Sequence, residues 1–135
     1  MRAFLLLLAV LIGVSAHARA ADDVAAAQKV IRAQVEAFGR DDAAAAYAHA
    51  APAIQEMFPQ PDVFMAMVRG SYAPVYRHQS FEFGEARVAD GKIAQRVRIV
   101  DADGVPWEAL YTLELQPDGS LKISGCTLLK AGQAV

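Results

Sequence analysis

The sequence predicts an α+β fold, with N-terminal helices packed on a curved, four-stranded antiparallel sheet. Up to about residue 76, apolar residues recur every three or four positions, which is typical of amphipathic helices. Four runs with alternating apolar residues follow, separated by the turn segments ADGK, DADG and QPDGS. Each contains an Asp-Gly pair that favours a β-hairpin. Because the helices precede the strands, the two kinds of element are expected in separate layers.

Composition is consistent with one globular domain. The chain has 135 residues, of which 55% are hydrophobic and 21% charged, with a formal net charge of -2. A domain of this size buries enough surface to fold without a disulfide or metal. The apolar content excludes intrinsic disorder, and the balanced charge gives no basic surface for nucleic acid.

The first twenty residues have the layout of a secretory signal peptide. Arg2 precedes an apolar run over residues 3–14, which is followed by small-residue cleavage sites at residues 16–18 and 18–20. Twelve apolar residues are short for a membrane span, which needs about twenty, although an uncleaved anchor is the alternative. We therefore expect a mature domain over residues 21–135, in the periplasm or secreted from a bacterium, with no stable membrane span.

Three helices are expected before the strands. The first covers residues 21–38 and stops at Gly39, and Asp41 is a suitable N-cap for a short alanine-rich helix that ends before Pro52. A turn of helix and a proline-bounded loop follow. Asp62 is then a suitable cap for a third helix, whose apolar positions are Val63, Met67, Val68 and Tyr72.

The expected strands cover residues 79–88, 92–101, 105–116 and 120–129. Alternation places Gln95, Trp107 and Tyr111 on an inner, mostly apolar face. With Tyr72 from the third helix, these residues are the candidate lining of a ligand pocket, and core packing is the alternative. A bulge near Gly125 would reverse the faces of the residues that follow it.

Arg96 and Arg98 share the outer face and could bind an anion. Cross-strand pairing with Glu108 and Glu114 is the favoured explanation for them.

Few residues indicate chemistry. Cys126 is the only cysteine, so no disulfide forms within the chain, and a packing role in a strand is favoured over a catalytic or bridging one. His49 and His78 have no neighbours at metal-ligand spacing. No phosphate-binding loop or nucleophile elbow is present. The sequence therefore predicts no cofactor and no metal.

Three blocks carry a family resemblance. Residues 30–58 (VIRAQVEAFGRDDAAAAYAHAAPAIQEMF), 64–77 (FMAMVRGSYAPVYR) and 107–126 (WEALYTLELQPDGSLKISGC) resemble the bacterial family of domain of unknown function 4864. More broadly, the layout resembles the nuclear transport factor 2-like superfamily, also called SnoaL-like or cystatin-like cones. Leu121 stands where such families usually have an aromatic residue. The resemblance implies a cone fold, while the narrower family carries no agreed function.

Three functions remain open. An exported, non-enzymatic domain that binds a small apolar molecule or a protein is favoured, because the inner strand positions offer no mid-strand carboxylate or histidine. The alternative is a cone-type lyase, isomerase or hydrolase that uses Tyr111 with His49, His78 or Asp101. A structural homodimer formed through the outer sheet face is the third.

Overall fold

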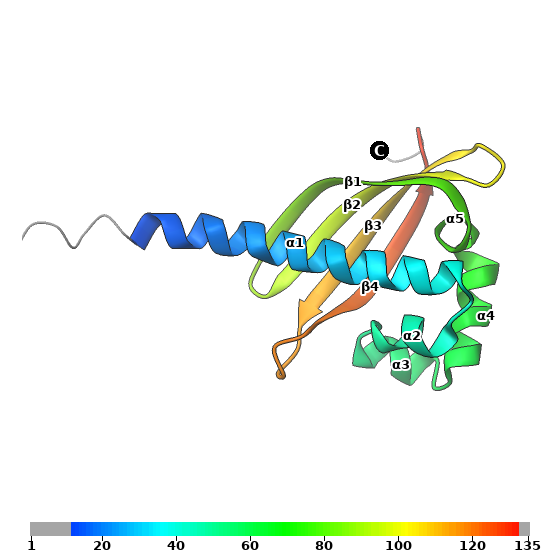
Figure 1. The fold of residues 1–135 in the computed structure, drawn as a ribbon, viewed down its shortest axis with the longest axis horizontal. Helices are drawn as coiled ribbons and strands as arrows, with labels where there is room; N and C mark the ends of the chain where they lie inside the picture. The colour runs from blue at the N-terminus through cyan, green and yellow to red at the C-terminus, as the bar shows by residue number, and fades with distance from the viewer. Residues whose placement is uncertain (1–11, 133–135) are drawn as a thin grey trace, which may run out of the picture.

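A layer of helices covers one face of a four-stranded antiparallel sheet in the computed structural model, which describes residues 12–132 (Figure 1). The helices are α1 (Ile12–Gly39), α2 (Ala43–Ala48), α3 (Pro52–Met57), α4 (Pro61–Ser71) and α5 (Ala73–Tyr76). The strands are β1 (His78–Ala89), β2 (Lys92–Asp101), β3 (Pro106–Leu115) and β4 (Leu121–Lys130). The predicted α+β class and antiparallel sheet are confirmed.

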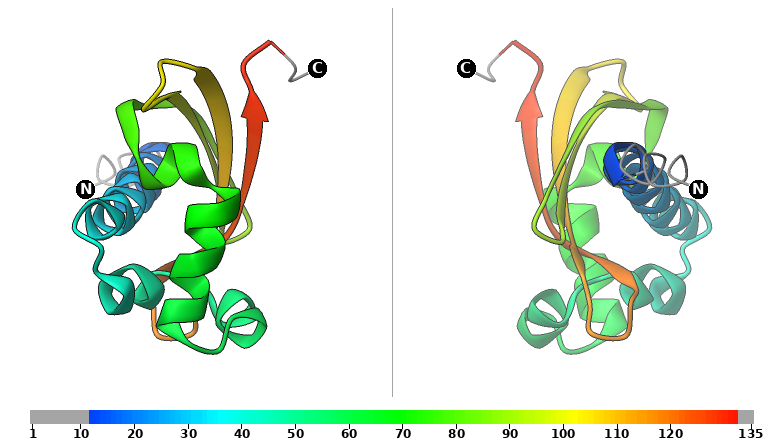
Figure 2. Two further views of the ribbon diagram at one scale, coloured as in Figure 1. Left: turned by 90° about the vertical axis from the view of Figure 1, so that its right-hand side faces the viewer. Right: turned by 90° about the vertical axis from the view of Figure 1, so that its left-hand side faces the viewer.

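The sheet is a meander with the order β1-β2-β3-β4, so every strand pairs with its neighbour in sequence. Asp90 and Gly91 both have positive φ, 51° and 73°, as the tight turn between β1 and β2 requires. The helices lie on one face, and none of the described elements covers the other (Figure 2).

Helix α1 is longer than predicted and runs along the sheet (Figure 1). Its end at Gly39 agrees with the prediction, but its start at Ile12 lies inside the expected signal peptide, whose residues 1–11 are outside the described part of the chain. From residue 16 on, the first fully buried side chain of the helix is Ala27. No helix among the described residues is long and apolar enough to cross a membrane.

Two predicted helix caps are wrong. Asp42, not Asp41, caps α2 by accepting a hydrogen bond from the amide of Ala45 at 3.1 Å. Asp41 instead has a φ of 57°, and the turn that ends α1 directs its side chain elsewhere. Gln60 is the N-cap of α4, because Pro61 occupies the first helical position and places Asp62 within the first turn. The short helix α5 was not predicted.

A bulge in β4 determines which side chains face inward. Thr112 pairs with Gly125, whereas the next residue, Leu113, pairs with Ile123, so Ser124 is the extra residue. Tyr111 consequently lies opposite Cys126 on the inner face. Glycine is required at 125, since a Cβ atom there would lie 2.9 Å from Oγ1 of Thr112.

The core lies between the helices and the inner face of the sheet. Its buried members include Ala27, Ile31, Phe38, Phe64, Met65, Val68, Ile93, Val97, Ile99, Ala109, Tyr111, Leu113 and Ile123. Inward and outward positions alternate along β2 as predicted, with Ile93, Gln95, Val97 and Ile99 all buried.

Candidate functional site

A cavity of about 520 Å³ lies between the helices and β4. Its walls come from the end of α1, from α3, α4 and α5, and from the inner face of β3 and β4. The lining residues are Gln34, Phe38, Ala50, Ile54, Met57, Phe58, Phe64, Met67, Val68, Ser71, Tyr72, Val75, Tyr111, Ile123, Ser124, Gly125, Cys126 and Thr127. Met57 is 71% exposed and Ser71 is also exposed, so these two residues lie where the cavity meets solvent.

Aromatic contacts hold the helical wall together. The ring of Phe64 on α4 lies 6.3 Å from that of Phe38 and 5.6 Å from that of Tyr47. The hydroxyl of Tyr47 donates to the carbonyl oxygen of Phe58 at 2.7 Å, and this bond ties α2 to the end of α3. The wall therefore depends on packing, because α2, α3 and α4 are each too short to be stable alone.

Tyr111 is the buried polar group of the cavity. It is 1% exposed, and its hydroxyl makes no hydrogen bond within the described part of the chain. Burial raises the pKa of Tyr111 well above 10, and the neighbouring Cys126 raises it further. The thiol of Cys126 is a weak hydrogen-bond partner at best. Tyr111 therefore keeps its proton at neutral pH and lacks an oxygen or nitrogen partner.

Tyr72 and Cys126 complete this part of the wall. The hydroxyl of Tyr72 donates to the carbonyl oxygen of Cys126 at 2.9 Å and so joins the α4–α5 connection to β4. Burial raises the pKa of Tyr72, and it raises that of the Cys126 thiol to about 12. Both groups are therefore neutral at physiological pH.

The lining carries no charged side chain. Its only titratable members are Tyr72, Tyr111 and Cys126, and none of them ionises near neutral pH. A general acid or base works best with a pKa close to the operating pH. A neutral, mainly apolar molecule would therefore leave no unpaired charge in the cavity.

Of the four residues expected to line a pocket, Tyr72 and Tyr111 line this cavity and the other two lie elsewhere. Gln95 is fully buried beneath an irregularity of β1, where the pairing shifts between Phe83 and Ala86. Its Nε2 donates to the carbonyl oxygens of Gly84 and Arg96 at 3.0 and 2.7 Å, and its Oε1 accepts from Gln28 at 3.1 Å. The buried amide of Gln95 therefore joins the backbone of β1 at its irregularity to that of β2 and to α1.

Trp107 is the second residue of β3, beside the β2–β3 turn. Its Nε1 donates to Oδ2 of Asp101 at 2.9 Å, and Nζ of Lys130 lies 5.7 Å from the centre of the indole ring. Asp101 also accepts from the amides of Asp103 and Val105. The bond from Trp107, followed by that from Val105, lowers the pKa of Asp101. This carboxylate therefore stays ionised, closes a turn and lies away from the cavity.

His49 and His78 do not line the cavity. His49 follows α2, and burial and the charge of Lys122 lower its pKa. Nδ1 of His78 lies 3.2 Å from the carbonyl oxygen of Val75, and its ring packs on Phe81 at 5.2 Å. Neither histidine lines the cavity, and the described residues contain no group of His, Cys, Asp and Glu side chains that could hold a metal ion.

The outer arginines form ion pairs, although the partners differ in part from those expected. Arg96 lies 3.0 Å from Glu108 as predicted, whereas Arg98 pairs with Glu82 on β1 at 3.5 Å. Glu114 instead lies 3.9 Å from Lys92. Strand register explains both pairs, because it brings Glu82 opposite Arg98 and Lys92 opposite Glu114.

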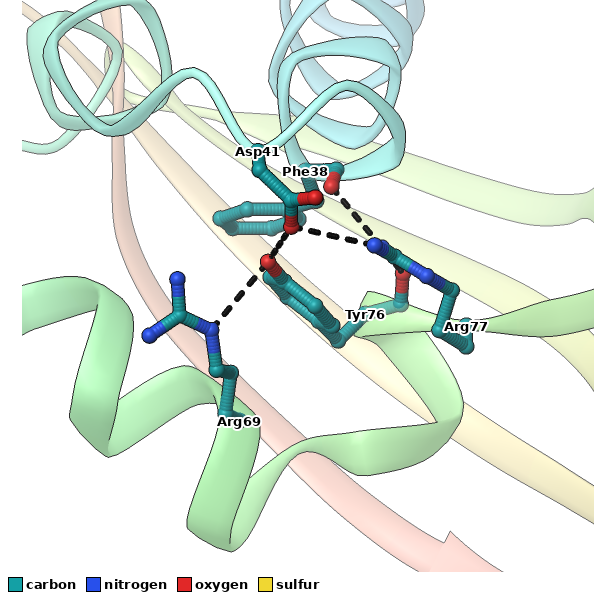
Figure 3. Close-up of polar contacts among 5 residues, drawn as sticks. All are labelled: Phe38, Asp41, Arg69, Tyr76 and Arg77. Atoms are coloured by element: carbon teal, nitrogen blue, oxygen red, sulfur yellow. Dashed lines mark hydrogen bonds and ion pairs between the residues drawn. The ribbon is translucent and has the colours of Figure 1, made fainter.

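A polar cluster that the sequence analysis did not predict stabilises the helical wall of the cavity (Figure 3). The carboxylate of Asp41 accepts hydrogen bonds from the hydroxyl of Tyr76 and, at 3.0 Å, from Arg77. Arg69 donates to the Tyr76 hydroxyl at 3.2 Å, and Arg77 also donates to the carbonyl oxygen of Phe38 at 2.9 Å. These residues are up to 39 positions apart in sequence, so no local pattern could have identified them.

Each member of this cluster already has a partner within it. The bond from Tyr76, followed by that from Arg77, lowers the pKa of Asp41. The cluster therefore joins the end of α1 to α4 and α5 beside Phe38, which lines the cavity. Its role is to position the wall.

Comparison with known proteins gave one match. The family model described as "Domain of unknown function (DUF4864)" matches residues 20–134. No curated protein and no solved structure matched the chain significantly.

Proposed function

Because the chain belongs to the family of domain of unknown function 4864, whose description assigns no activity, we propose its function from the cavity: a non-enzymatic domain that binds a small apolar molecule. The observation that carries this proposal is a cavity of about 520 Å³ whose lining holds no charged side chain. Small-molecule sites typically measure about 300–1,000 Å³ and are mainly apolar, with a few polar groups that fix orientation.

The lack of titratable groups near neutral pH favours binding over catalysis. The groups considered for a cone-type lyase, isomerase or hydrolase were Tyr111, His49, His78 and Asp101. Only Tyr111 lines the cavity, and its raised pKa makes it a poor proton acceptor. A general base must reach the proton that it abstracts, and neither the histidines nor Asp101 do so.

The same proposal places the fold among the nuclear transport factor 2-like cones. Helices on one face of a curved antiparallel sheet, with a cavity between the layers, support this placement (Figures 1 and 2). We do not extend the proposal to a homodimer, because Arg96 and Arg98 on the uncovered face already pair with glutamates of their own chain.

Export of the domain to the periplasm or the medium is the other part of the proposal. The family match begins at residue 20, next to the expected cleavage sites. The side chains of residues 16–19 are exposed, and from there on the first fully buried side chain of α1 is Ala27. Removal of the first 18 or 20 residues would therefore leave the packed part of α1 intact.

A fluorescence titration tests the binding function. N-phenyl-1-naphthylamine, a neutral apolar dye, should bind the domain with increased emission and 1:1 stoichiometry. Ser71→Trp should weaken binding at least tenfold, because the indole would fill the mouth of the cavity. Ala66→Trp is the matched control, since Ala66 is also exposed on α4 but does not line the cavity. Equal dye binding by both variants, or none by the unmodified domain, would refute the proposed site.

A further inference from the structure

The cavity contains one polar group whose bonding is incomplete. Among the described buried side chains, the hydroxyl of Tyr111 alone lacks a hydrogen-bond partner. An unpaired buried hydroxyl is unfavourable, and native proteins nearly always provide such a group with a partner. Because the described part of the chain supplies no partner for this hydroxyl, a bound molecule or an ordered water is expected to do so.

Several other polar side chains of the lining have a hydrogen-bond partner within the chain. The Tyr72 hydroxyl donates to the carbonyl oxygen of Cys126, and Nε2 of Gln34 donates to that of Ala46 at 3.1 Å. Oγ of Ser124 bonds to Thr112 at 3.1 Å. Ser71 and Thr127 are exposed at the opening, where water can serve them. The Tyr111 hydroxyl is the buried donor of the described lining without a partner, and because it is fully covered, a ligand reaches it only once the neighbouring Cys126 side chain moves.

The charge of the ligand follows from the same lining. No arginine, lysine or histidine lines the cavity, so a carboxylate or phosphate would be buried without a counterion. An ammonium group would also remain unpaired, because no aspartate or glutamate is present. The Tyr111 hydroxyl keeps its proton and can donate it to a neutral acceptor.

We propose, on the basis of the binding function above, that the cavity takes a neutral molecule with an apolar body and one carbonyl oxygen, which accepts a hydrogen bond from the Tyr111 hydroxyl. The apolar body lies against Phe38, Phe64 and Val68 on the helical wall. The Cys126 thiol, the weak neighbour of the hydroxyl, moves aside by rotation about its Cα–Cβ bond. Tyr111 thereby acts as the specificity-determining residue of the site.

Three probes of similar size separate this inference from the binding function. 2-Decanone, decane and decanoate are each used at pH 7.5 to displace N-phenyl-1-naphthylamine from the domain. 2-Decanone should bind roughly tenfold more tightly than decane, because its oxygen completes the pairing of a buried hydroxyl. It should also bind at least tenfold more tightly than decanoate, whose charge would be unpaired.

Tyr111→Phe supplies the decisive comparison. The variant should bind decane as the original chain does, while the preference for 2-decanone over decane disappears. In a second measurement, which needs no variant, the carbonyl stretching band of 2-decanone should move to lower frequency on binding. This band remains a test even if Tyr111→Phe does not fold.

The outcomes distinguish the two proposals. Failure of the dye itself to bind would overturn the binding function, whereas a bound dye that 2-decanone does not displace would overturn this inference alone. Equal displacement by 2-decanone and decane would leave the binding function intact and overturn the role of Tyr111. Tight binding of decanoate, or a preference for 2-decanone that survives in Tyr111→Phe, would also overturn the inference.

Discussion

Tyr111 and Cys126 lie opposite each other on the β3–β4 ladder, and both line the cavity. The bulge at Ser124 produces this pairing, because without it Cys126 would point to the opposite face. Burial raises the pKa of both side chains, so each is neutral under conditions in which an exposed phenol or thiol would begin to ionise. The thiol is therefore a packing group and an internal reporter of the cavity.

Cys126 should react slowly with thiol reagents in the native protein. Its pKa is raised from 9.0 to about 12, and only the thiolate is nucleophilic. Labelling by 5,5′-dithiobis(2-nitrobenzoic acid) at pH 7.5 should be far slower than in denaturant, and a bound apolar ligand should slow it further. Rapid labelling of the folded domain, or a dimer that reductant dissociates, would show instead that the thiol is reactive or bridged.

The same thiol should make stability sensitive to alkaline pH. Because its folded pKa lies above its unfolded value, the native state holds the proton more tightly, and the resulting stability is lost as pH rises from 9 toward 12. Cys126→Ser should lower stability by about 1 kcal/mol at pH 7. It should also reduce the alkaline loss, measured as urea midpoints at pH 7 and 10. The raised pKa of Tyr111 also makes the native state lose stability as pH rises, so part of the alkaline loss of stability should remain in Cys126→Ser.

Asp41 should stabilise the fold at neutral pH and stop doing so in acid. Its pKa is lowered by the bonds from Tyr76 and Arg77, so its contribution is present above the unfolded pKa of about 3.8 and is lost as pH falls through the lower folded value. Asp41→Asn should lower the melting temperature at pH 7, with a smaller difference near pH 3. Asp103→Asn, which changes an exposed aspartate of the β2–β3 turn, is the control. Equal effects of the two variants at both pH values would argue against the cluster.

Sequence periodicity predicted the elements well and the site only in part. The change from helical to strand period and the Asp-Gly turns are local signals, and all four strands formed within two residues of their expected limits. The functions of Gln95 and Asp41 depend instead on a strand irregularity and on residues distant in sequence. Strand alternation places both Tyr111 and Gln95 on the inner face of the sheet. It could not show that Tyr111 lines the cavity while Gln95 lies beneath the β1–β2 hairpin. The sequence predicted a possible bulge near Gly125. The pairing register of β3 and β4 in the structure shows that this bulge places Cys126 on the inner face.

Processing of the N-terminus should follow the proposed export. Expression of the full chain in a bacterium with a general secretion pathway should give a mature protein in the periplasm or the medium. N-terminal sequencing should find that it begins at Arg19 or Ala21. Replacing Ala18 with Arg would disrupt both candidate sites and should cause the uncleaved precursor to accumulate. Recovery of the original chain in the membrane fraction with Met1 intact would contradict export by cleavage.

Gln95 should be essential to the sheet although it lies outside the cavity. Gln95→Leu keeps a similar volume but removes the buried amide that donates to the carbonyl oxygens of Gly84 and Arg96 and accepts from Gln28. The expected loss is about 1–3 kcal/mol of unfolding free energy. Gln79→Leu is the control, because the bond from Gln79 to Ala102 is exposed and water can replace it. Urea denaturation measures both variants, and the dye titration should show that Gln95→Leu still binds while folded. A Gln95→Leu domain as stable as the control would mean that the backbone of β1 finds other partners.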